Sequence, residues 1–274
     1  MARAGGRQRS VDRSRPDEEN DSFVRALARG LSVLALFDIE HPDWGLNDIC
    51  ARTGMSKTTA YRMVRTLEAA DFLVYDSQRE RYHLGKAMIP GAYLTMSYIG
   101  FARVVHPFLE RLSEDTGETI ELTVSGPGGA VVVDQVASSN PFRLNLPIGR
   151  IQNLASTSAF RMHMAYLSGA EQRKMLGGSQ VARTPNTVTD PGEIIERLAA
   201  ERAEGLAYDL EEQDLGVCAV SAPVLEHDGT VRAVLTLVAP AERFGPKDRK
   251  RKSEAVRAAA ARLTEYLSSG VVGG

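Results

Sequence analysis

The chain has 274 residues, of which 43% are hydrophobic, and a formal net charge of −2 at pH 7. This length exceeds what most single hydrophobic cores hold, so we expect a soluble globular protein of two domains. A net charge so close to zero excludes nucleic-acid binding through bulk electrostatics alone, because any DNA affinity must then come from local positive surface.

Membrane insertion and thiol chemistry are not expected either. No uninterrupted apolar run approaches the length of a membrane span, and the Arg-rich N-terminus lacks the apolar core of a signal peptide. The two cysteines, Cys50 and Cys218, fall in different predicted domains, which argues against a disulfide framework or a thiol-rich metal site. The sequence therefore predicts a cytoplasmic protein with no membrane partner, no cofactor and no metal site.

Residues 1–21 lack a hydrophobic period and are predicted to form a disordered tail. The arginines of this tail could insert into a DNA minor groove, as basic arms beside helix-turn-helix domains do. An acidic run from Asp17 to Glu19 would weaken the attraction to phosphates, and we therefore favour an inert tail.

Residues 22–85 carry the pattern of three helices followed by a hairpin. A first helix is expected over residues 23–39, and its apolar stripe is predicted to pack in the domain core; the stripe contains Val24, Leu27, Leu31, Leu34 and Ala35. A second helix is expected to end at Gly54, the residue best able to adopt a positive φ. Its apolar face contains Leu46, Ile49 and Cys50.

A third helix follows, with Ser56 as its expected N-cap. Its apolar face contains Ala60, Met63, Val64 and Leu67. No acidic residue interrupts the opposite, cationic side before Glu68, so its first turns suit the major groove, where lysine, threonine and arginine reach base edges and phosphates. This cationic side contains Lys57, Thr58, Tyr61, Arg62 and Arg65.

Apolar and aromatic segments at 73–75 and 82–84 flank a polar turn at 76–80, which predicts a hairpin with Arg79 and Arg81 at its tip. An ordinary amphipathic helix with a solvated face is the commoner structure, but it leaves the glycine turn, the helix cap and the basic hairpin unexplained. Their order is that of a winged helix-turn-helix. The predicted DNA contacts are Ser56, Lys57, Thr58, Thr59, Tyr61, Arg62, Arg65, Arg79 and Arg81.

With these motifs the chain resembles the IclR family of bacterial transcription regulators. Three segments resemble the N-terminal domain of that family: RALARGLSVL from Arg25, TGMSKTTAYR from Thr53 and RYHLGK from Arg81. Three more resemble its effector-binding domain: GETIEL from Gly117, EGLAYDLEE from Glu204 and GVCAVSAPV from Gly216. The resemblance covers about residues 23–267 and implies a DNA-binding regulator that responds to a ligand.

Residues 86–100 resemble the linker helix of the family, in which Pro90 must lie near the first turn or produce a kink. Residues 101–270 are expected to form an effector-binding domain. We predict a helix over 101–116, β-hairpins over 120–133 and 217–238, and helices around 157–167, 191–204 and the C-terminal end. Antiparallel strands with helices outside them indicate an α+β fold, and the resemblance implies a GAF-like α/β ligand-binding domain.

A cysteine or hydrolase-type enzyme with an accessory DNA-binding domain is the alternative function. Cys218 is the candidate nucleophile, and His106, His163 and His227 are candidate bases, but nothing in the sequence places a base beside the thiol or lowers its pKa. A cysteine within a strand is more often a small buried hydrophobe. No phosphate loop, zinc motif or pair of catalytic carboxylates stands out, so we do not expect an enzyme.

The resemblance implies an effector cup on one sheet, with contacts at Ser158, Ala159, Asp209, Val217, Cys218 and Thr236. Where family members commonly read P-L-H-A-T-A-x-G-K, this chain has Ala155 for the histidine and Phe160 for the glycine, and Val238 replaces a common serine. A more apolar cup favours an aromatic or otherwise hydrophobic acid, with its head group at Ser158, Thr236 and the helix-start amides. Phe160 could cover the body of this ligand or could equally face the core.

The sequence therefore predicts a ligand-responsive transcription regulator that senses a small organic acid. We expect a homodimer, which could pair into a tetramer, to present two winged helices to a pseudo-palindromic DNA operator. A sequence-neutral architectural DNA protein is the least favoured class, because the net charge is nearly neutral.

Overall fold

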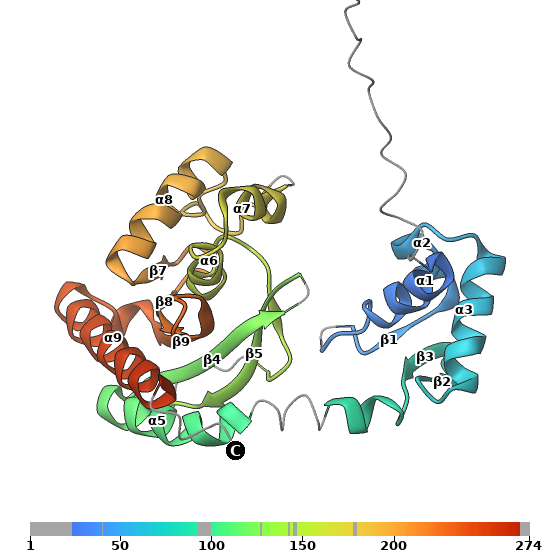
Figure 1. The fold of residues 1–274 in the computed structure, drawn as a ribbon, viewed down its shortest axis with the longest axis horizontal. Helices are drawn as coiled ribbons and strands as arrows, with labels where there is room; N and C mark the ends of the chain where they lie inside the picture. The colour runs from blue at the N-terminus through green and yellow to red at the C-terminus, as the bar shows by residue number, and fades with distance from the viewer. Residues whose placement is uncertain are drawn as a thin grey trace, which may run out of the picture. The chain divides into compact units, whose positions relative to one another are not determined.

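The computed structural model describes residues 24–39, 41–92, 100–126, 128–141, 143–144, 147–177 and 180–268. The predicted tail at 1–21 and residues 93–99 of the predicted linker helix lie outside these described residues. The chain forms two compact units (Figure 1). The smaller unit runs to Lys86, except for Asp38–Pro42, which group with the larger unit that begins again at Ala87.

The smaller unit combines three helices with a three-stranded sheet. Its helices are α1 (Arg25–Leu34), α2 (Leu46–Thr53) and α3 (Lys57–Ala69). Its antiparallel strands lie in the order β1-β3-β2, where the strands are β1 (Asp43–Trp44), β2 (Leu73–Asp76) and β3 (Arg81–Leu84). The core residues are Val33, Trp44, Ile49, Ala60, Val64, Leu73 and Tyr82. This is the predicted winged helix-turn-helix.

The turn between α2 and α3 has the predicted chemistry. Gly54 ends α2 at φ +70°, a left-handed conformation in which a side chain would be strained. Two residues later the Ser56 hydroxyl accepts a hydrogen bond from the Thr59 backbone N–H at 3.3 Å. The cap therefore fixes where α3 begins and which residues occupy its first turn.

The prediction for the first helix was wrong in two respects: α1 ends at Leu34 rather than near residue 39, and part of its apolar stripe is exposed. Val24, Leu27 and Leu31 were expected in the core, but their exposed fractions are 61%, 61% and 55%. The helical period that places them on one stripe is present, yet α1 packs through Val33, on another side of the helix. Of the predicted stripe, Leu34 packs against the core of its own unit, whereas Val24, Leu27, Leu31 and Ala35 are exposed.

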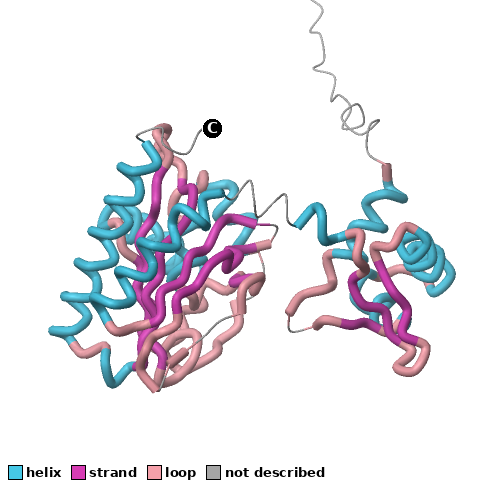
Figure 2. Tube along the Cα trace, turned by 90° about the horizontal axis from the view of Figure 1, so that it is seen from below, coloured by secondary structure: helices cyan, strands magenta, loops and turns pink. Residues whose placement is uncertain are grey.

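The larger unit is built on one six-stranded antiparallel sheet of strand order β6-β5-β4-β9-β8-β7. Figure 2 shows these strands side by side with helices packed along them. The two predicted hairpins are present as β4–β5 and β8–β9. The strands are β4 (Thr119–Gly126), β5 (Gly129–Val136), β6 (Ile151–Gln152), β7 (Ala207–Leu210), β8 (Val217–Leu225) and β9 (Val231–Pro240).

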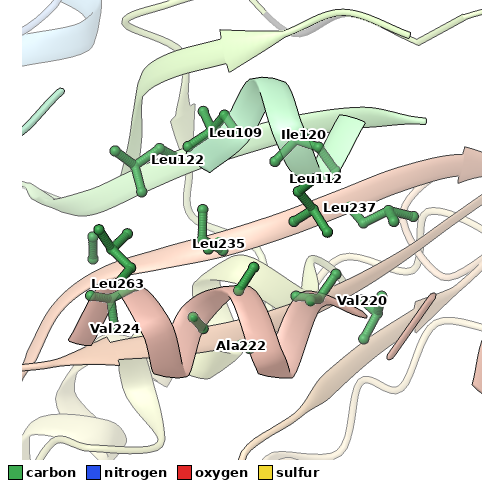
Figure 3. Close-up of a cluster of buried hydrophobic side chains, with 14 of the residues drawn as sticks. Leu109, Leu112, Ile120, Leu122, Val220, Ala222, Val224, Leu235, Leu237 and Leu263 are labelled. Carbon is green, nitrogen blue, oxygen red and sulfur yellow. The ribbon is translucent and has the colours of Figure 1, made fainter. Parts of the chain in front are cut away.

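Two long helices, α5 (Gly100–Thr116) and α9 (Pro246–Ser268), cover one face of this sheet (Figure 1). Alternate residues of the central strands point toward them and form the main core. Figure 3 shows this core with Leu109 and Leu112 from α5, Leu263 from α9, and strand residues Ile120, Leu122, Val220, Ala222, Val224, Leu235 and Leu237.

The opposite face carries α6 (Ser158–Met164), with α8 (Pro191–Glu204) packed beside α6 and α7 (Gly169–Leu176) beside α8. On this face a polar row crosses the central strands, because the register pairs Glu121 of β4 with Gln135 of β5 and with Thr236 of β9. Thr236 in turn pairs with Ser221 of β8. One face therefore stabilises the domain, and the other presents polar groups under α6.

The stretch after the wing fits the expectation for Pro90. Residues 88–92 are helical, so Pro90 lies in the first turn, where its missing N–H leaves no helical hydrogen bond unmade. The predicted helix over 101–116 corresponds to α5, and the one over 191–204 corresponds to α8.

Candidate functional site

The outward side of α3 is a cationic surface. Lys57, Thr58, Tyr61, Arg62 and Arg65 are all exposed. Arg65 is the member of this group with an acidic neighbour, since its Nη1 donates to the Glu68 carboxylate at 2.8 Å. Ala60 and Val64, on the other side, are fully buried. Burial of one side thus holds the basic side outward, in the position that a helix needs to enter a major groove.

Ser56 and Thr59 have a different part in this surface. The Ser56 hydroxyl caps α3, and it lies 2.9 Å from the Thr59 hydroxyl. Both side chains are therefore engaged with the start of the helix itself. They order the first turn of α3, and any contact that they make with the DNA backbone would be additional to this structural role.

The wing places its two arginines differently from the prediction. Arg79 lies in the turn between β2 and β3 with 73% of its side chain exposed. Arg81 is the first residue of β3, and its guanidinium forms an ion pair with Asp43 and lies 3.6 Å from the Asp48 carboxylate. Arg81 therefore joins β3 to β1 and α2. The prediction that Arg81 lies at the hairpin tip is corrected, because it belongs to β3 and its guanidinium is directed at Asp43 and Asp48.

The polar face of the larger sheet opens into a cavity of about 300 Å³. This size suits a ligand of about one ring with its substituents. Its polar lining consists of Glu121, Arg150, Gln152, Asn153, Thr157, Ser158, Arg183, Asp209, Gln213, Asp214 and Thr236. Its apolar lining consists of Leu144, Ile151, Leu154, Val217, Ala219 and Val238.

A chain of three hydroxyls crosses the cavity floor from helix to sheet. Ser158, the first residue of α6, lies 2.8 Å from Ser221 on β8, and Ser221 lies 2.8 Å from Thr236 on β9. All three side chains are at most 3% exposed. Each hydroxyl can donate or accept, so the direction of this chain can adapt to a bound group.

Two carboxyl groups line the same cavity. Glu121 is 1% exposed and accepts hydrogen bonds from the Gln135 and Gln152 amides at 3.2 and 3.4 Å. Burial raises the pKa of Glu121 to about 7, against the lowering effect of the two amides and of Arg150. Burial also raises the pKa of Asp209 to about 6, although it accepts the backbone N–H groups of Glu212 and Gln213.

Five of the eight predicted effector contacts line this one cavity: Ser158, Asp209, Val217, Thr236 and Val238. They come from α6, β7, β8 and β9, segments far apart in the sequence. The structure shows that these five side chains line the same cavity. Binding of an effector by them remains a prediction.

The other three predicted contacts face elsewhere. Phe160 is 2% exposed and packs between α6 and α8 with Met164, Ile194 and Leu198. Successive helix residues are turned by about 100°, so with Ser158 facing the cavity, Phe160 faces α8. Ala159 packs with Met162, Ala207 and Val234, and Cys218 belongs to the core on the α5–α9 side. The expectation that Ala159 and Cys218 contact the effector is corrected, and of the two positions left open for Phe160 the structure shows the one in the core.

Sequence reasoning missed several lining residues, above all Glu121, Arg150, Gln152 and Arg183. Glu121 could have been identified from the sequence, because it lies between the apolar residues Ile120 and Leu122 and therefore belongs to the opposite face of β4. The alternation alone does not tell whether that face meets water or a cavity. The two arginines and Gln152 lie in or beside irregular segments, where no period signals which way a side chain points.

Cys218 and His163, two of the candidate enzyme groups, have environments that do not suit nucleophilic catalysis. Burial, with the nearby charges of Glu211 and Asp209, raises the pKa of the Cys218 thiol to about 11. Burial lowers the pKa of His163 to about 4, and its two ring nitrogens contact the hydroxyls of Thr123 and Ser125, both at 3.1 Å. A thiol that stays protonated is a poor nucleophile, and this histidine has structural partners.

Neither a metal site nor a membrane-spanning helix is found in the described part of the chain. No group of three or more histidine, cysteine, aspartate or glutamate side chains there is arranged to hold a metal ion. No helix there combines the length and the apolarity that crossing a membrane requires.

Comparison with known proteins gives family matches in both units. The model of the IclR helix-turn-helix domain matches residues 26–77, and that of the bacterial transcriptional regulator IclR C-terminal domain matches residues 93–265. The HTH-type transcriptional regulator BhcR of Paracoccus denitrificans is 28% identical over 247 residues, which are 90% of this chain and 88% of that protein.

Solved structures of IclR-family proteins have the same fold as this chain. The crystal structure of a protein assigned as an IclR transcriptional regulator, from Silicibacter sp. TM1040, superposes with a TM-score of 0.82 at 28% identity, covering 88% of this chain and 96% of that one. An IclR homolog from Microbacterium hydrocarbonoxydans, solved in complex with 4-hydroxybenzoate, shares the fold with a TM-score of 0.70 at 20% identity, covering 88% and 98% of the two chains.

The matches agree with the geometry of both units, a winged helix-turn-helix with a basic α3 and a sheet domain with a lined cavity. They identify a DNA-binding transcription regulator with a small-molecule effector rather than an enzyme. The C-terminal match alone spans more than half of the sequence, and the protein therefore belongs to the IclR family of bacterial transcriptional regulators.

Proposed function

We propose that two copies of the chain bind a pseudo-palindromic operator, each placing α3 in the major groove of one half-site and Arg79 of the wing against the phosphate backbone. The observation that carries this proposal is the exposed basic side of α3, which a buried apolar side and a capped first turn hold outward. The proposed contacts are Lys57, Thr58, Tyr61, Arg62, Arg65 and Arg79, with Ser56 and Thr59 ordering the helix start.

Self-association has support in the smaller unit. The exposed stripe of α1, formed by Val24, Leu27 and Leu31, is apolar and lies outside the core of its own unit. A second copy is the occupant that fits the operator proposal, because one winged helix reads too few bases and a two-fold dimer reads two inverted half-sites. A tetramer has no comparable support and stays a prediction.

The proposed effector is a small organic acid with an apolar body, bound in the cavity over β4, β9 and β8. Arg150 and Arg183 offer positive charge in its lining, and side chains such as Leu154, Val217 and Val238 offer apolar contact. The preference for an apolar body now rests on these residues instead of Phe160. The Microbacterium protein was crystallised with 4-hydroxybenzoate, which makes that compound the first probe to use.

Selection of bound duplexes from random-sequence DNA tests the DNA part. We expect enrichment of two inverted half-sites with centres about one helical turn apart. On the selected operator, Arg62→Ala should weaken binding by roughly 1–3 kcal/mol in gel-shift titrations, if Arg62 contacts a guanine edge. Enrichment of a single half-site would exclude the dimeric arrangement.

Lys247→Ala provides the matched control, because it removes one exposed positive charge from the larger unit. It should leave operator affinity unchanged. Arg79→Ala should weaken binding to all duplexes alike and lower the salt dependence by about one phosphate contact per subunit. Equal affinity of Arg62→Ala and the parent protein, both correctly folded, would rule out α3 as the docking helix.

A further inference from the structure

Glu121 is a buried carboxyl in the cavity that has no positive partner close by. The two groups that contact it, Gln135 and Gln152, are neutral amides. No ion pair with a lysine or arginine is seen for Glu121 among the described residues, although the charge of Arg150 lowers its pKa. Burying a carboxylate without a partner is costly, so a ligand group that donates a hydrogen bond to it would be strongly favoured.

The other charged groups of the cavity leave the floor negative. Asp209 is 4% exposed and adds a second carboxyl. Asp214 and Arg183 lie 3.4 Å apart and are about half exposed, which places this pair toward the mouth. His163 of α6 packs over the same face of the sheet, but its ring nitrogens contact the hydroxyls of Thr123 and Ser125. A ligand carboxylate at Thr236 would therefore lie beside Glu121 and would meet like charge wherever Glu121 is ionised, above its pKa of about 7.

We propose that Glu121 selects the effector, by accepting a hydrogen bond from a hydroxyl or amino group at the end of the ligand remote from its carboxylate. This inference rests on the proposed function, in which the ligand is an organic acid. The acid end then lies toward Arg150 and Arg183, and the donor end lies deepest, against Glu121 and the hydroxyl chain of Thr236, Ser221 and Ser158. The ligand class is an acid that carries a distal hydrogen-bond donor.

The two orientations of the ligand have opposite pH dependences. A donor at Glu121 favours the ionised carboxylate, so affinity should rise with pH as this group ionises around its pKa of about 7. An acid head group at the floor would instead need Glu121 protonated, and its affinity would fall over the same range. Asp209, with a pKa of about 6, titrates below most of this range.

Calorimetric titration with matched ligand pairs tests the proposal. The pairs are 4-hydroxybenzoate with 4-methylbenzoate, and 4-hydroxybutanoate with pentanoate, in which a methyl group replaces the hydroxyl at similar volume. At pH 8 the wild-type protein should prefer the hydroxylated member of at least one pair by roughly tenfold or more, and that preference should grow between pH 6 and 8. In Glu121→Gln the two members of each pair should bind within about twofold of one another.

Glu196→Gln is the control, since Glu196 is an exposed glutamate of α8 outside the cavity lining; it should keep the wild-type preference. Equal affinity of the wild-type protein for both members of every pair that binds overturns the proposal while the organic-acid effector stands. The same holds if Glu121→Gln keeps the preference. Binding of none of the four acids overturns the organic-acid effector and this inference together. The comparison of ligand pairs on the wild-type protein tests the proposal even if Glu121→Gln does not fold.

Discussion

Glu121 should make the free energy of unfolding depend on pH. Its pKa is about 7 in the folded protein and near the ordinary 4.5 when the chain is unfolded. Between these values the folded state holds a proton that the unfolded state has lost, so stability falls as pH rises from about 4.5 through 7. Glu121→Gln removes this component, and the variant should gain on the order of 1–3 kcal/mol relative to wild type between pH 5 and 8.

Urea unfolding of both proteins across that pH range measures the difference. Asp209 contributes a fall of the same sign at somewhat lower pH, but it is present in both proteins and cancels. Glu196→Gln should run parallel to the wild type. A stability difference between Glu121→Gln and wild type that stays constant from pH 5 to 8 would mean that Glu121 is already solvated and ionised in the folded state.

At the scale of elements, a buried network of two arginines and two glutamates joins α6, α8 and the segment after β7. Arg161 is fully buried and its Nε donates to Glu201 of α8 at 2.9 Å; it also donates to the carbonyls of Ala155 and Tyr208. Arg197 bonds both Glu201 and Glu212, at 3.1 and 2.7 Å. The backbone N–H of Glu212 donates a hydrogen bond to the carboxylate of Asp209, which lines the cavity. The network therefore supports one wall of the cavity.

Arg161→Met should therefore destabilise the larger unit by roughly 3–5 kcal/mol, because it leaves buried acceptors without their donor. Arg202→Met, which alters an exposed arginine of α8 stacked on Tyr166, should cost less than about 1 kcal/mol. Circular dichroism during denaturation reports on the whole chain, and fluorescence of Trp44, the single tryptophan, reports on the smaller unit. Equal losses in the two variants would show that the network is dispensable.

The elements themselves were largely predictable from local pattern. Helix α3 and the hairpins β4–β5 and β8–β9 follow from periods of 3.6 and 2 and from turn residues such as Gly54. What a period cannot give is the partner of a face. The stripe of Leu27 and Leu31 was read correctly as one side of a helix, yet nothing in the sequence says that the core lies elsewhere.

The site was predictable only in part, for the same reason. The resemblance led to α6, β7, β8 and β9, but one step along a helix or strand decides between cavity and core, as Ser158 and Phe160 show. Arg81 is a related case, since a basic residue in a wing looks like a phosphate contact until Asp43, distant in sequence, is found to bind it. Such outcomes depend on tertiary packing, which one sequence does not display.

At the scale of the whole molecule, the family assignment joins a DNA-binding unit to an effector domain, and regulation requires that the two be energetically coupled. Coupling means that the effector changes operator affinity, and that the operator changes effector affinity by the same factor. The net charge of −2 makes this change in operator affinity easier to detect, because binding to non-operator duplex should be weak at moderate salt.

The most direct test of ligand-responsive DNA binding is the anisotropy of a labelled, selected operator, titrated with protein at fixed salt, with and without a saturating acid from the calorimetric panel. We predict that the bound acid changes the operator Kd by at least about fivefold and leaves non-operator duplex unaffected. An operator Kd that does not change, at acid concentrations where calorimetry shows the cavity to be filled, would contradict the account.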